Sequence, residues 1–168
     1  PVPTRCAGIG EIRERLSGEP PAIFDGVLAI PTARAETATV FRKHAALAAA
    51  GGPEFGSKQE FAVEIWRSIL YKERTRTGRA PREAVSALGG LLFNRLRRSA
   101  EEVVPEIRSV RTALLAAGAV AAEVTGSGSG VFAVCDGPES VSMVLERFGQ
   151  TYSGPMSLLR AVEFPART

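Results

Sequence analysis

The sequence is poor in the residues that hold metal ions and build disulfide frameworks. Its 168 residues include one histidine, His44, and two cysteines, Cys6 and Cys135, which lie far apart and belong to no CxxC pair. This scarcity argues against a zinc site, a disulfide scaffold and any Ser-His-Asp or Cys-His hydrolase that does not use His44. We therefore expect no metal site, and the low cysteine content fits a reducing cytoplasm.

Long apolar runs are also missing. None approaches the roughly 18 residues that a membrane-spanning helix requires, and the first ten residues lack the basic and apolar stretches of a secretion signal. We therefore expect a soluble, cytoplasmic protein without membrane contacts. Hydrophobic residues make up 45% of the chain and charged residues 23%, as in ordinary globular proteins. A single domain over residues 1–168 is the expectation for this length.

Positive charge is distributed unevenly. The net charge is only +3, yet the stretch from Trp66 to Arg98 holds nine lysine and arginine residues against two glutamates. Such a stretch is typical of a solvated helix pair with a basic loop, and it also suits an anionic partner. A phosphorylated small molecule and a nucleic acid backbone are both compatible with this charge.

Breaker residues and apolar periodicity divide the chain into short strands and amphipathic helices. The pattern predicts strands over 24–30, 121–125, 131–135 and 158–164, and helices over 36–50, 58–73, 83–100, 105–117 and 137–148. Residues 1–22 are expected to form a linker or an edge strand. This order predicts an α+β fold in which helices cover a mainly antiparallel sheet.

Particular residues give these elements testable details. Four apolar residues fall on one face of the first predicted helix: Ala38, Phe41, Ala45 and Ala48. His44, on the same helix, is expected to face solvent, and Cys135 to pack as a small hydrophobic residue. Asp136 precedes Glu139 by three residues, the spacing of a capping box, and Gly149 is expected to end that helix.

The strongest local signal is the glycine-rich loop, which we define as Thr125, Gly126, Ser127, Gly128, Ser129 and Gly130, between two predicted strands. Glycines allow successive N–H groups to point inward around an anion, and the hydroxyl groups can add to such a site. The competing interpretation is a flexible hairpin connection that binds nothing. The loop lacks the Lys-Ser/Thr pair of a P-loop, and a strand follows it where a dinucleotide-binding motif requires a helix.

Three segments together resemble a known family. They are Leu92-Phe-Asn-Arg-Leu96, the proline-initiated helix with Ala-Leu-Leu-Ala-Ala-Gly118, and Val124-Thr-Gly-Ser-Gly-Ser-Gly-Val-Phe132. Their order and spacing are similar to the C-terminal half of the 4-diphosphocytidyl-2-C-methyl-D-erythritol kinases, members of the GHMP kinase superfamily. Gly8-Ile-Gly-Glu11, the strand Val27 to Pro31, and Thr37-Ala38 with Val40-Phe41-Arg42 resemble earlier family segments more loosely.

The resemblance implies a ferredoxin-like α+β domain on the substrate side of an ATP-dependent kinase of isoprenoid precursor synthesis. In such a kinase, the glycine-rich loop lines the phosphate and substrate cleft, and Thr37 borders the substrate. Asn94 belongs to the motif, and it is expected either to hydrogen-bond into the cleft or to cap local backbone. ATP and Mg²⁺ would serve the complete kinase, and none is expected to bind this chain alone.

The resemblance also has limits. Arg95 and Glu36 stand where the family usually has an acidic residue and a serine. Residues 53–81 match no family segment and are expected to be a helical, basic insertion. The family's ATP-binding loop, catalytic aspartate and lysine have no counterpart here, so we expect no catalytic residue in this chain. We therefore expect a partner, either a missing N-terminal half or a second copy. The alternative is a non-catalytic binding module whose basic 66–98 region contacts nucleic acid or another anion.

Overall fold

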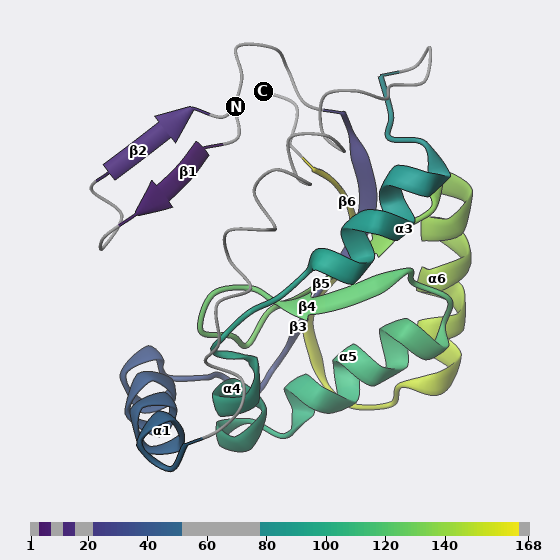
Figure 1. Cartoon of the computed structure of the whole chain (residues 1–168). Coiled ribbons are helices and arrows are strands. Elements are labelled where there is room, and N and C mark those ends of the chain that lie inside the picture. Colours follow the sequence, from purple (N-terminus) through teal and green to yellow (C-terminus); the bar gives the residue numbers. More distant parts are fainter. Residues whose placement is uncertain (1–3, 8–11, 16–21, 52–77, 165–168) are drawn as a thin grey trace.

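The computed structural model describes residues 4–7, 12–15, 22–51 and 78–164, and within it the predicted α+β fold is confirmed (Figure 1). Four strands form the main sheet in the order β4-β5-β3-β6. They are β3 (Phe24–Pro31), β4 (Ala121–Val124), β5 (Val131–Cys135) and β6 (Met156–Phe164). Every neighbouring pair is antiparallel, as expected from the sequence.

The central strand β3 sets the register of the sheet. It pairs with β5 so that Asp25 lies opposite Cys135 and Ala29 opposite Val131, and with β6 so that Val27 lies opposite Ala161. Because successive side chains of a strand point to opposite faces, Val27 and Ala29 enter one hydrophobic core while Phe24 enters another. The sheet is therefore apolar on both faces.

Helices cover these two faces unequally. The helices are α1 (Thr37–Ala49), α3 (Arg82–Leu91), α4 (Arg97–Val103), α5 (Glu106–Ala116) and α6 (Gly137–Thr151). The helices α5 and α6 bury Ile107, Leu114 and Phe148 in the larger core, and α3 buries Leu88 against the opposite face. None of the helices in the described parts of the chain is long and apolar enough to cross a bilayer.

The prediction of a single helix over 83–100 is wrong, because the chain forms two helices there. Helix α3 ends at Leu91, where Leu92 takes an extended conformation with φ −62° and ψ 122°, and α4 begins at Arg97. The Gly89-Gly90 pair lowers helix propensity just before the break. Asn94, in the middle of the break, hydrogen-bonds to backbone outside both helices. These tertiary contacts outweigh the apolar periodicity that predicted one helix.

Helix α1 also differs from expectation, although its predicted position is confirmed. Val40 is its one buried residue. Phe41, which belongs to the predicted apolar face, is 52% exposed. Among the described elements, α1 packs chiefly against α4 (Figure 1). His44 is half-buried rather than solvent-facing, with Nδ1 3.5 Å from the Ser99 hydroxyl oxygen.

The start of α6 departs from the predicted capping box. Asp136 occupies the N-cap position, but its side chain makes no capping hydrogen bond and pairs instead with Arg82, at 3.2 Å. The helix continues past Gly149 and ends at Thr151. Cys135 is fully buried, which confirms its expected packing.

The N-terminal expectation of a linker or edge strand is replaced by a hairpin. Strands β1 (Thr4–Ala7) and β2 (Ile12–Arg15) form a separate two-stranded antiparallel sheet that is not part of the main one. Several predictions fall outside the described residues: the helix over 58–73 with Trp66, the Cys6 side chain and most of the 53–81 insertion.

Candidate functional site

The glycine-rich loop joins the antiparallel strands β4 and β5. The Thr125 amide donates to the Gly130 carbonyl at 2.9 Å, and the Gly128 amide donates to the Thr125 carbonyl at 3.0 Å. Gly126 and Gly128 have φ values of +57° and +91°, a region that side chains other than glycine rarely adopt. The strand–loop–strand interpretation of the sequence is therefore confirmed, and glycine is needed at both positions.

The loop packs against the body of the domain and does not project into solvent. An added Cβ at Gly128 would lie 3.0 Å from Ile107 Cδ1, 3.4 Å from Ala35 Cβ and 3.5 Å from Ala100 Cβ. Ser129 is only 8% exposed. The first turn of α5, the middle of α4 and the segment before α1 therefore hold the far side of the loop, while Thr125 and Gly126 stay exposed.

Thr37 reaches the loop from the N-terminus of α1. Its hydroxyl oxygen lies 2.9 Å from the Ser127 hydroxyl oxygen, although 90 positions separate the two residues. The amides of the first helical turn have no intrahelical acceptor, and the helix dipole makes this end positive. The N-cap Glu36 makes no side-chain capping bond and accepts a hydrogen bond from the Thr39 hydroxyl at 2.6 Å.

Asn94 reaches the loop from the break between α3 and α4. Its Nδ2 donates to the carbonyl oxygens of Val124 and Gly126, each at 2.7 Å, and its Oδ1 accepts from the Leu96 amide at 2.8 Å. All of the residues predicted for the site, namely the loop, Thr37 and Asn94, therefore lie together.

Backbone donors of the loop remain available on the exposed side. The amides of Gly126 and Ser127 donate to no backbone acceptor in the part of the chain that the structure describes. The hydroxyl groups of Ser127 and Thr37, which bond to one another, and the first-turn amides of α1 add further donors beside them. Uncharged donors arranged in this way suit the oxygens of a phosphate group.

Two positive side chains are close to this site in sequence. Arg34 directly precedes Ala35, which contacts Gly128, and Arg95 directly follows Asn94. Both side chains are exposed, and neither has an ion-pair partner among the residues that are described. They leave positive charge near the loop for an anionic ligand.

The other arginines of the basic region are used within the fold. Arg97 pairs with Glu123 at 3.2 Å and Arg98 with Glu102 at 3.1 Å, while Arg79 and Arg82 pair with carboxylates elsewhere. Of the five described arginines between 66 and 98, only Arg95 lacks an ion pair. Among the described residues of this stretch, four of the five arginines are therefore used in ion pairs.

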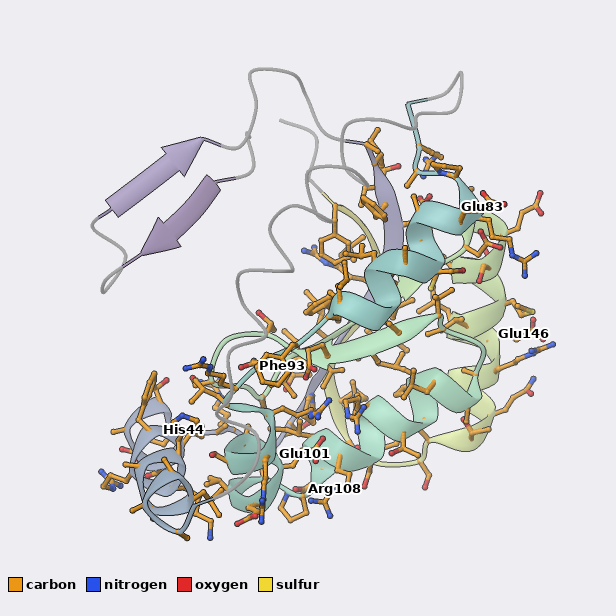
Figure 2. All side chains as sticks on the ribbon, viewed as in Figure 1. His44, Glu83, Phe93, Glu101, Arg108 and Glu146 are labelled. Carbon is orange, nitrogen blue, oxygen red and sulfur yellow. The ribbon has the colours of Figure 1, made fainter. Side chains whose placement is uncertain are left out.

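Two buried carboxylates pair with arginines and connect the elements next to the glycine-rich loop. Glu101 on α4 is 7% exposed and accepts hydrogen bonds from Arg108 at 3.1 Å and Arg111 at 3.0 Å; Figure 2 shows Glu101 and Arg108 close together where α4 meets α5. Glu123, on β4, is 3% exposed, and burial raises the pKa of its carboxyl group. The network fixes α4, α5 and β4, the three elements around the loop.

A separate cavity of about 340 Å³ lies between α6 and β6, beside Asp25 near the start of β3. Arg79 bridges Asp25 and Glu163 there, with Nη2 2.7 Å from Glu163 Oε1. Burial, with a smaller contribution from the Asp25 charge, raises the pKa of the Cys135 thiol to about 11. This end of the sheet therefore carries a structural ion pair and an unreactive thiol, and contains none of the predicted site residues.

The described residues gather no metal site. No three histidine, cysteine, aspartate or glutamate side chains within 4–7, 12–15, 22–51 and 78–164 are grouped as ligands for an ion. The donors at the loop are amides and hydroxyls, which fit phosphate oxygens rather than a cation.

The fold agrees with the comparison to protein families. Residues 78–154 match the family model described as GHMP kinases C terminal. This part of the chain is therefore similar to the C-terminal domain of GHMP kinases, and the described residues have an α+β architecture.

Solved kinases share this fold. A 4-(cytidine 5'-diphospho)-2C-methyl-D-erythritol kinase matches with a TM-score of 0.62 and 23% identity over 94% of this chain and 48% of its own. The L. major mevalonate kinase, solved with R-mevalonate, matches with a TM-score of 0.67 and 15% identity over 98% of this chain and 49% of its own. The homoserine kinase of Cytophaga hutchinsonii matches with a TM-score of 0.54 and 14% identity over 86% of this chain and 41% of its own. The chain thus spans about half the length of these kinases.

Sequence reasoning missed the residues that support the loop from behind. Ala35, Ala100 and Ile107 bound Gly128, and none of them belongs to a motif. Ile107 lies within the apolar pattern that predicts the helix over 105–117. No local pattern could have assigned these contacts, because each joins segments far apart along the chain.

Proposed function

We propose that this chain forms the substrate-side part of a GHMP-type small-molecule kinase whose glycine-rich loop binds phosphate groups of the substrate. The observation that carries the proposal is the contact between the Ser127 and Thr37 hydroxyls. It brings the N-terminus of α1 to a loop whose Gly126 and Ser127 amides donate to no backbone acceptor among the described residues. The acceptor that we propose is a cytidine-diphosphate sugar alcohol of isoprenoid precursor synthesis. The choice rests on the motifs around Asn94 and the loop and not on the fold, because mevalonate kinase gives a TM-score of 0.67 and the 4-(cytidine 5'-diphospho)-2C-methyl-D-erythritol kinase 0.62.

In the complete kinase, ATP would donate its terminal phosphoryl group, with Mg²⁺, to a substrate hydroxyl. Positioning and electrostatic stabilisation carry most of such a reaction. The residues of this chain would bind and orient the substrate: the Gly126 and Ser127 amides donate to phosphate oxygens, and the Thr37 hydroxyl borders the acceptor. The isolated chain is expected to be inactive, because no catalytic residue of the family has a counterpart in it.

The partner would be the other half of the kinase, or a second copy of this chain. The chain covers about half of the length of each of these solved kinases, which supports the other half of the kinase as the partner. Two large apolar side chains near the site are exposed, Phe41 at 52% and Phe93 at 47%, and exposed apolar surface favours association. Light scattering of the isolated chain at high concentration tests self-association, which a monomeric mass would exclude.

Complementation tests the proposal directly. This chain is mixed with a separately produced N-terminal half from a 4-diphosphocytidyl-2-C-methyl-D-erythritol kinase, and ATP-dependent phosphorylation of the cytidylyl substrate is measured. We expect activity only in the mixture, and lower activity with Ser127→Ala. Ser142→Ala is the matched control, because its hydroxyl lies on α6 and bonds to the Pro138 carbonyl. The proposal would be contradicted if no N-terminal half gave activity in the mixture and this chain did not bind the substrate.

A further inference from the structure

The side chain of Asn94 is saturated by contacts with the protein itself. Both hydrogens of its Nδ2 have acceptors, the Val124 and Gly126 carbonyls, each 2.7 Å away. An asparagine amide nitrogen has only two hydrogens to donate. The Leu96 amide occupies Oδ1 at 2.8 Å and thereby orients the side-chain amide with Nδ2 toward the loop. No side-chain donor of Asn94 is left for an anionic ligand.

The two carbonyls that Asn94 holds determine where the loop amides point. In a planar trans peptide, the carbonyl and the N–H of one unit point in opposite directions. The Gly126 carbonyl shares its peptide unit with the Ser127 N–H, so binding this carbonyl to Asn94 turns the Ser127 N–H away from Asn94. The Val124 carbonyl likewise shares a unit with the Thr125 N–H, which donates to Gly130 and closes the loop.

We propose that Asn94 is a positioning residue that holds the glycine-rich loop in its anion-binding conformation and does not itself touch the substrate. This inference rests on the proposed function of the loop and assigns Asn94 a role different from direct phosphate binding. It also explains why the chain breaks the helical pattern at 92–96: an uninterrupted helix would not leave Asn94 free to reach two carbonyls of the loop.

Two variants separate the contacts. Asn94→Ala removes all three hydrogen bonds, whereas Asn94→Asp keeps an acceptor for the Leu96 amide and loses the donors to the loop. Gln150→Ala and Gln150→Glu make the corresponding changes at an exposed position near the end of α6 and serve as matched controls. Circular dichroism and thermal melting establish that each variant is folded before the loop is measured.

The first readout is hydrogen exchange of the Thr125 and Gly128 amides in the full chain, followed by NMR. Losing the restraint on two neighbouring carbonyls should raise the exchange rates on the order of tenfold in both Asn94 variants and in neither Gln150 variant. The second readout is the affinity for inorganic pyrophosphate, followed by the Ser127 amide shift. For Asn94→Ala, the dissociation constant should rise on the order of tenfold.

The outcomes distinguish the alternatives. Faster exchange with weaker pyrophosphate binding supports the positioning role. Unchanged exchange in both variants overturns it, and unchanged exchange with lost affinity in Asn94→Ala would place the side chain in direct contact with the anion. If the unaltered chain binds no pyrophosphate, anion binding by the loop fails, while the exchange rates still decide whether Asn94 holds the loop.

Discussion

The hydroxyl oxygens of Thr37 and Ser127 lie 2.9 Å apart and join the first residue of α1 to the glycine-rich loop across 90 positions of sequence. The contact therefore fixes two sets of donors relative to one another, and its strength can be measured.

A double-mutant cycle with Thr37→Val and Ser127→Ala measures this contact. Because both hydroxyls are accessible to water, we expect a coupling free energy of only about 0.5–1 kcal/mol in urea unfolding. Thr37→Ser keeps the hydroxyl and should retain the coupling. A coupling indistinguishable from zero would show that the two hydroxyls are independent in solution.

Gly128→Ala should destabilise the domain by about 1–3 kcal/mol, since alanine is strained at φ +91° and its Cβ would lie 3.0 Å from Ile107 Cδ1. Gly90→Ala is the control. Gly90 lies in α3 with open space where a Cβ would be, so alanine should stabilise the protein by about 0.5–1 kcal/mol. Denaturant unfolding measures both, and equal effects of the two changes would refute the packing of the loop.

Glu123 should make stability depend on pH in an unusual direction. Burial raises its pKa above the ordinary 4.5, so the folded protein binds this proton more tightly than the unfolded chain. The stability of the unaltered protein relative to Glu123→Gln should therefore increase as the pH falls from neutral toward about 4.5, and decrease as it rises again. Urea unfolding of both proteins between pH 4.5 and 8 measures the difference.

Glu102 gives a comparison of opposite sign. Hydrogen bonds from Lys43 and Arg98 lower its pKa, so its favourable contribution should be present above 4.5 and be lost as the pH falls further. The difference between the unaltered protein and Glu102→Gln should thus shrink on acidification. A Glu123→Gln series that follows the same direction as Glu102→Gln would contradict the assigned burial of Glu123.

Cys135 should resist thiol reagents as long as the protein is folded. With a pKa of about 11, only about one thiol in a thousand is ionised at pH 8, and the side chain is fully buried. In a Cys6→Ser background, labelling by a disulfide reagent should be at least about 100-fold slower in the native protein than in urea. Rapid native labelling at pH 8 would exclude the observed burial.

Much of the fold could be predicted from local patterns. The apolar runs placed β3, β5 and β6 within two residues, and the pattern over 105–117 predicted the position of α5. These patterns work because burial of one face imposes a period on the sequence. The same reasoning failed for α1, because nothing in a helical stripe reveals whether a neighbouring element covers it.

The sequence by itself determined that a loop of alternating glycine and serine joins two strands, since only glycine readily takes the positive φ values at Gly126 and Gly128. Only the tertiary structure decided what this loop contacts. Thr37, Asn94 and Ile107 reach it from three separate elements, and the break between α3 and α4 exists where Asn94 binds the loop. Local propensity selects the conformations available to each segment, whereas long-range hydrogen bonds and packing select which of them persists and thereby assemble the site.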